Sequence, residues 1–162
     1  MLDQELASAM KFIIETAGTL KPYYYEVPQD FEYPAVFFPQ PDIVSFGDTL
    51  KTYALSYNWY IKFFHKDTQS AQAVCFKVLE ALQYRRRNVP LIASDGSLTG
   101  KTFKLNDPTT RPLDHAAQLT LSWDSPRPYH MEHFPKVEHF DLTLITKNAF
   151  NNALTLIGEK HD

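Results

Sequence analysis

The residues of this chain that are best suited to bind a metal ion are three histidines: His130, His133 and His139. Three carboxylates lie near them, namely Glu132, Glu138 and Asp141. A zinc site needs three or four such ligands converging in tetrahedral geometry. The residues around position 140 alternate as in a strand, and no His-Glu-x-x-His helix occurs. We therefore interpret the histidines as solvent or interface residues and expect no metal site and no cofactor.

Catalytic motifs are absent from the sequence. No Gly-x-Ser-x-Gly nucleophile elbow occurs, and Lys101-Thr102 follows one glycine, Gly100, in place of a full phosphate-binding loop. These absences favour a protein that is not an enzyme, with no catalytic residues. A small metal-dependent enzyme that uses the C-terminal histidines is the less favoured alternative.

Two further groups of reactive or charged residues have structural interpretations. Cys75 lies on the apolar stripe of an expected helix, where it is a buried small hydrophobe. Arg85, Arg86 and Arg87 follow the same helix, whose C-terminal end favours positive charge. The arginine cluster could also contact an acidic partner surface or passing nucleic acid.

The composition indicates a globular protein with an excess of aromatic side chains. The chain has 162 residues, which suits one domain, and its net charge of −3 shows no basic excess for nucleic-acid binding. It contains 12 Phe, 9 Tyr and 2 Trp, more than one small core requires, which suggests protein interfaces as well as an aromatic-rich core. We expect no signal peptide and no membrane span.

The clearest structural signal is a long strand followed by a helix. Residues 53–63 alternate between apolar and more polar positions, which predicts a β-strand with one buried face. The next segment repeats apolar residues at helical spacing, with Asp67 or Thr68 able to cap its start. The expected stripe consists of Ala71, Val74, Cys75, Val78, Leu79 and Leu82.

The remaining pattern predicts an α+β fold with a mostly antiparallel sheet packed against two or more helices. A first helix is expected over residues 2–17, capped by Asp3 and ended by Gly18. Short strands are expected over residues 35–38 and 89–93, with the first at a sheet edge because prolines flank it. A second long strand is expected over residues 117–124, stopped by Pro126 and Pro128.

The chain divides into residues 1–130, a single α+β domain, and residues 131–162, a C-terminal extension. The extension is too apolar for a disordered tail. It should pack either on the domain or on a neighbouring subunit.

Three segments resemble the tail terminator, or tail completion, proteins of long-tailed bacteriophages. They are residues 33–42, the long strand with its helix, and the closing strand Gln118-Leu-Thr-Leu-Ser-Trp-Asp124 with Arg127-Pro-Tyr129. The resemblance covers residues 1–130 in element order and size. It implies a structural protein that forms a ring, usually a hexamer, on the head-proximal end of the tail tube. Such a ring stops tube polymerisation and provides the surface to which the head attaches.

The same resemblance implies a set of partners and a location. The partners are other copies of the chain, the major tail tube protein and the head completion or connector protein, while DNA crosses the lumen without specific binding. The location is the virion, with the host cytoplasm during assembly, and no membrane is involved. From the residues themselves, the candidate interface positions are Tyr23, Tyr24, Tyr25, Phe37, Phe38, Arg85, Arg86, Arg87, Phe134 and Phe140. Head completion, head–tail joining and minor capsid proteins are the alternative functions.

Overall fold

Two long antiparallel strands form the centre of the protein. The computed structural model describes residues 3–130 of the chain. Strand β4 (Thr52–Phe64) pairs with β8 (Ala116–Pro128) along the full length of both. Alternate residues of each strand are buried, and the Tyr57 ring stacks on Trp123 with a centroid distance of 4.7 Å. The two alternating patterns in the sequence thus become one aromatic-rich sheet face.

Shorter strands extend this pair on both sides. The sheet order is β1-β2-β4-β8-β7. Strand β3 also pairs with β4, at residues 53–58, whereas β2 pairs with residues 62–64. The β1–β2 pair is parallel and the other pairs are antiparallel. The bounds of the added strands are β1 (Lys21–Tyr24), β2 (Ala35–Phe38), β3 (Asp42–Gly47) and β7 (Thr109–Leu113). A separate ribbon consists of β5 (Asn88–Ile92) and β6 (Leu98–Lys104).

Two helices pack on the apolar face of the sheet. Helix α1 (Gln4–Ala17) begins after Asp3, whose carboxylate accepts from the Glu5 amide, and ends at Gly18 with a φ of 90°. Helix α2 (Thr68–Tyr84) begins after Asp67, whose carboxylate accepts from the Ser70 amide. Both predicted caps are therefore confirmed, with Asp67 as the cap of the second helix.

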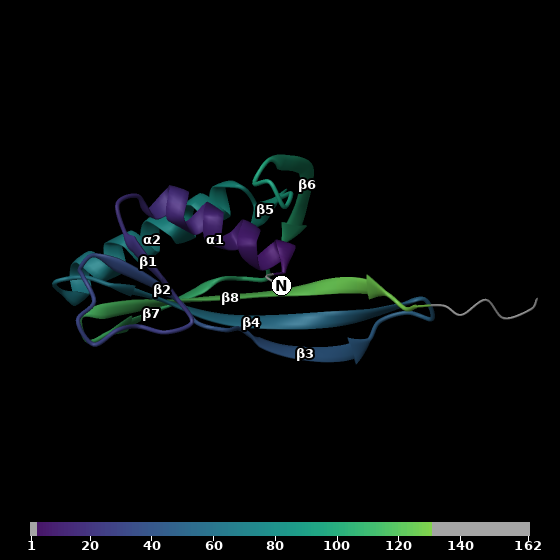
Figure 1. Cartoon of the computed structure of the whole chain (residues 1–162), viewed down its shortest axis with the longest axis horizontal. Helices are drawn as coiled ribbons and strands as arrows, with labels where there is room; N and C mark the ends of the chain where they lie inside the picture. Colours follow the sequence, from purple (N-terminus) through teal and green to yellow (C-terminus); the bar gives the residue numbers. More distant parts are fainter. Residues whose placement is uncertain (1–2, 131–162) are drawn as a thin grey trace, which may run out of the picture. The chain divides into compact units, whose positions relative to one another are not determined.

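The core lies between the helices and the sheet. Figure 1 shows α1, α2 and the β5–β6 ribbon over one face of the long sheet, while no described element covers the opposite face. Four predicted stripe residues of α2 are fully buried: Ala71, Cys75, Val78 and Leu82. The predicted α+β class, with a mostly antiparallel sheet and two helices, is confirmed. No helix in residues 3–130 is long and apolar enough to span a membrane.

The prediction that residues 35–38 form an edge strand is wrong. Strand β2 lies between β1 and β4, and its residues Ala35, Val36 and Phe38 are buried. The flanking prolines, Pro34 and Pro39, stand just outside the strand, so each of its four residues keeps an amide for the ladder. The edge position belongs to β1, which contains Pro22.

The prediction that Pro126 and Pro128 stop the second long strand is also wrong, since β8 continues through Pro128. The Tyr129 amide donates to the Lys51 carbonyl at 3.0 Å, so odd-numbered amides of this strand point toward β4. The two prolines are even-numbered and point toward the open edge. They remove no hydrogen bond from the β4–β8 ladder, which explains why the strand tolerates them.

Candidate assembly surfaces

A polar network fixes the start of α1 to the sheet. The Asp3 carboxylate accepts from the Tyr57 hydroxyl and from the Arg127 guanidinium, the latter at 2.7 Å. Burial disfavours the charge of Arg127, but Asp3 and Glu5 offset this, so the pKa of the guanidinium is raised. Asp3 therefore has two roles, because its carboxylate caps α1 and also pairs with side chains of the sheet.

Glu5 adds a second pair of contacts from the first turn of α1. Its carboxylate accepts from the Trp123 indole at 2.8 Å and from the Ser125 hydroxyl at 2.9 Å. Both donors lie on β8 and are almost fully buried. Buried donors need such partners, so Glu5 sets the position of α1 along the sheet. The network is a scaffold that holds the surfaces described below.

The Tyr57 phenol makes stability depend on pH in the alkaline range. Burial, followed by the hydrogen bond to Asp3, raises its pKa to about 12 from 10.0. The folded chain therefore keeps this proton between pH 10 and 12, where the unfolded chain releases it. The contribution of the Tyr57 proton to the free energy of unfolding is complete below pH 10 and is lost as the pH rises toward 12.

We expect the stability advantage of the wild type over Tyr57→Phe to shrink by about 2 kcal/mol across that interval. Urea unfolding at a series of pH values measures this difference, in which the other tyrosines cancel. Tyr84→Phe is the control, because Tyr84 is 94% exposed and makes no such contact. A Tyr57→Phe difference that stays constant between pH 10 and 12 would contradict the assignment.

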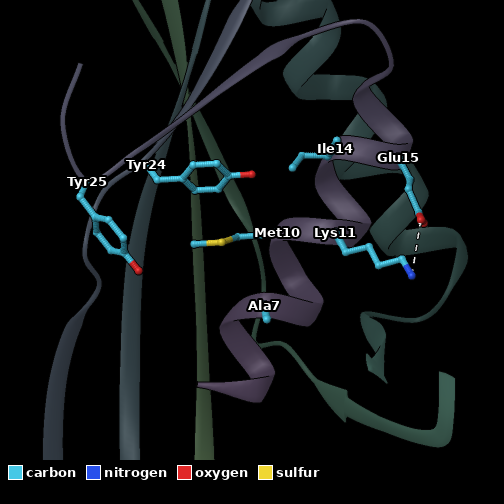
Figure 2. A pocket seen from close by; sticks show the side chains of 7 residues that line it. All are labelled: Ala7, Met10, Lys11, Ile14, Glu15, Tyr24 and Tyr25. Carbon is cyan, nitrogen blue, oxygen red and sulfur yellow. Dashed lines mark ion pairs between the residues drawn. The ribbon is translucent and has the colours of Figure 1, made fainter. Parts of the chain in front are cut away.

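An apolar groove separates α1 from the end of β1. Its volume is about 660 Å³, and Figure 2 shows the rings of Tyr24 and Tyr25 on one side and α1 side chains on the other. The helix contributes Ala7, Met10, Lys11, Ile14 and Glu15, with a Lys11–Glu15 ion pair at 4.0 Å. Tyr24 and Tyr25 are almost half exposed, at 45% and 47%. Such a groove offers aromatic and aliphatic surface to a partner.

A second exposed surface lies on the outer side of α2. Phe76 is 50% exposed and Tyr84 is 94% exposed, two turns apart along the helix. They line a shallow depression with Leu79, Glu80 and Arg85. Exposed aromatics of this size on one helix face are typical of contact surfaces.

The third surface is the outer edge of β3. All six of its residues are exposed, and they include the large apolar side chains Ile43, Val44 and Phe46. The strand pairs with β4 on one side and with no other described strand. Exposed apolar edge strands are available for pairing with another chain.

The aromatic residues predicted as interface positions have different environments. Tyr24 and Tyr25 line the groove, whereas Tyr23 is half-buried, and its hydroxyl accepts from the Glu32 amide. Phe37 is half-buried on β2. Phe38 is fully buried, 5.6 Å from Trp59 between ring centroids, so its side chain has no accessible surface for a partner.

The three arginines also separate. Arg85 caps the C-terminal end of α2 and lies over the Phe12 ring at 5.5 Å. Arg87 forms an ion pair with Asp107, and Arg86 is exposed. Arg86 and Arg87 both have positive φ, 53° and 65°, so the chain reverses direction there. Arg85 and Arg87 therefore have structural contacts, while the side chains of Arg85 and Arg86 are accessible to a partner.

Several predicted positions lie outside the described residues. These are Phe134 and Phe140, two of the three histidines, and the whole extension 131–162. His130 is described and exposed. Within residues 3–130, no cluster of three or more histidine, cysteine or acidic side chains could hold a metal ion.

The β3 edge and the outer face of α2 were not among the positions predicted from the sequence. Residues 42–47 contain Ile43, Val44 and Phe46 in a six-residue run with no proline, which is a usable strand signal. Phe76 and Tyr84 lie outside the apolar stripe of α2, so the helical spacing of the sequence is enough to predict that they are exposed.

Comparison with known proteins identifies relatives of nearly equal length. The chain is 31% identical to the uncharacterized protein YqbJ of Bacillus subtilis strain 168 over 139 residues, which are 86% of this chain and 95% of YqbJ. The chain belongs to the YqbJ family. It is also 26% identical to XkdJ, a protein of the phage-like element PBSX of the same strain, over 142 residues. This match covers 87% of the chain and 97% of XkdJ. No protein-family model matches the chain.

Proposed function

We propose that this chain is the tail terminator of a phage or phage-like element. The observation that carries the proposal is the match to XkdJ, a phage-like element protein, over almost the whole of both chains. The resemblance of residues 33–42 and 118–129 to tail terminators supports the same assignment. In this role the chain is a structural protein of the virion and has no catalytic activity.

The uncovered face of the sheet supports the proposed position around a DNA channel. Residues that alternate with the core residues on β4 and β8 point to this face, and they include Ser56, Asn58, Thr120 and Ser122. Tyr60, Lys62 and Asp124 share this face, so β4 and β8 present one basic side chain on it and no basic patch that could hold the phosphate backbone, on a chain of net charge −3. DNA would cross a lumen lined by this face without specific binding.

A ring needs two different surfaces on each subunit, because its interface is heterologous. The groove beside Tyr24 and Tyr25 and the outer face of α2, with Phe76 and Tyr84, are two such surfaces on separate elements. We assign them to the contact between neighbouring copies, which form a hexamer. The two ends of the ring then contact the major tail tube protein and the head completion protein.

Polymerisation of the tube protein tests this function. The purified chain is added to tube protein of the same phage during assembly, and tube lengths are measured by electron microscopy. We expect shorter tubes as the concentration of the chain rises, with the chain present at one end of each tube. Unchanged tube lengths, with the chain bound instead to purified heads or portals, would support the head completion alternative and overturn the proposal.

A pair of variants tests the assigned ring surfaces in the same assay. Phe76→Ser combined with Tyr84→Ser should abolish ring formation and leave tubes uncapped, because both aromatic side chains are already exposed in the single subunit. Leu50→Ser is the control, since Leu50 is 98% exposed on the loop between β3 and β4. Equal capping by both variants would show that the outer face of α2 is not part of the contact between copies in the ring.

A further inference from the structure

Proline distinguishes β3 from the other open edges of the main sheet. Within residues 3–130, the outermost strands β1 and β7 contain Pro22 and Pro112, and the part of β8 beyond β7 contains Pro126 and Pro128. Proline lacks the amide hydrogen and protects an edge against pairing with another chain. Strand β3 has no proline between Asp42 and Gly47, and three of its large apolar side chains are exposed.

The backbone groups of β3 that face outward can be assigned from the loop that follows. The Asp48 amide donates to the Thr52 carbonyl of the β4 side at 3.3 Å, so even-numbered residues face β4. Because backbone hydrogen-bonding groups alternate in direction along a strand, the amides and carbonyls of Ile43, Ser45 and Gly47 point away from β4. No hydrogen bond joins these outward groups to another part of the described chain.

We propose that β3 pairs antiparallel with β3 of a second copy of this chain, about a twofold axis at Ser45. This register alone uses all three outward residues, since it places Ser45 opposite its own counterpart and Ile43 opposite Gly47 of the second copy. It forms about six main-chain hydrogen bonds, two for each hydrogen-bonded pair. A shift by two residues loses one of the three pairs.

The side chains are complementary in the same register. Val44 lies opposite Phe46 of the second copy, and the twofold axis repeats this contact. These are non-hydrogen-bonded pairs, in which side chains approach most closely. Val44 and Phe46 are 58% and 44% exposed in the single subunit, and an aromatic side chain against a β-branched one is a favourable cross-strand pair. The self-complementarity favours a second copy over an unrelated strand as the partner.

Charge opposes the pairing at its two ends. Asp42 lies opposite Asp48 of the second copy in this register, and both carboxylates are at exposed positions. Added salt screens such repulsion. The pair should therefore tighten as the ionic strength rises. The interface is isologous and closes on itself, so it is distinct from the heterologous contact of the proposed ring and is tested separately.

Disulfide trapping tests the register. Hydrogen-bonded partners have Cα atoms about 5.5 Å apart, within the range that a disulfide spans. Ser45→Cys should therefore form a disulfide-linked dimer under mild oxidation at least about tenfold faster than Leu50→Cys, which is exposed on the same hairpin. The native Cys75 is buried and leaves the comparison clean. Equal rates for the two variants would overturn the proposal.

Analytical ultracentrifugation of the full chain tests the hydrogen bonds. Ser45→Pro removes an outward amide and no β3–β4 bond, as the natural prolines do in β8. The wild type and Ser45→Ala should sediment at twice the mass of Ser45→Pro. The fraction of the wild type that is paired should increase at higher salt. Equal masses for Ser45→Pro and Ser45→Ala would overturn the proposal. The cysteine variants decide the matter if Ser45→Pro fails to fold.

Discussion

Replacing Asp3 with alanine is expected to lower the free energy of unfolding by about 3 kcal/mol, because one carboxylate has three roles. It caps α1 through the Glu5 amide, accepts from the Tyr57 hydroxyl and pairs with Arg127. Its removal leaves a partly buried guanidinium and a buried phenol without their acceptor. Urea unfolding monitored by tryptophan fluorescence measures the loss.

Asp67→Ala is the matched control for this prediction. Asp67 caps α2 in the same way, through the Ser70 amide, but its other contact is with the Ser70 hydroxyl on the surface. We expect a loss of about 1 kcal/mol for this cap alone. In an Arg127→Met background the cost of Asp3→Ala should fall, since the two side chains are coupled. Equal losses for the two aspartates would show that the contacts to Tyr57 and Arg127 contribute nothing.

Replacing Leu82 with alanine should lower the free energy of unfolding by about 2–5 kcal/mol. Leu82 lies at the end of the buried stripe of α2 and is fully buried in the core that includes Trp59 and Trp123. The loss combines the transfer of its side chain with the cavity that remains. Thermal and urea unfolding both measure it.

Leu79→Ala is the control on the same helix. Leu79 is partly buried and lines the outer depression of α2, so its replacement removes less buried surface. We expect a loss of about 1 kcal/mol. If Leu79→Ala destabilises the chain as much as Leu82→Ala, then the helix is rotated from the orientation described.

The long elements could be predicted because their periodicity is strong and their caps are local. The alternation at residues 53–63 and the helical stripe of α2 each follow from burial of one face. Asp3 and Asp67 act on amides within three residues, so the sequence contains both partners.

Sheet order could not be predicted from the prolines, because their effect depends on which way each missing amide would point. Pro126 and Pro128 face the open edge of β8 and do not end it. Pro34 and Pro39 stand outside β2 and leave it free to pair on both sides. These directions depend on the partner strand, which is distant in sequence.

The candidate surfaces were predicted in part. Tyr24 and Tyr25 are partly exposed and so stay candidate interface positions, while Phe38 lies in the core beside Trp59. A run of aromatic residues indicates abundant apolar surface but does not say which rings the sheet will cover. The β3 edge becomes visible only when the neighbours of every strand are known.

The length of tails made without this protein tests the tail terminator assignment most directly. The gene is deleted in the phage or phage-like element that carries it, and tail lengths in induced lysates are measured by electron microscopy. If the protein is the tail terminator, its loss should give tubes of widely varying length, many longer than normal, with no heads attached, and restoring the gene should give normal particles. Tails of normal, uniform length beside filled but unattached heads would contradict this assignment and would indicate a head completion protein.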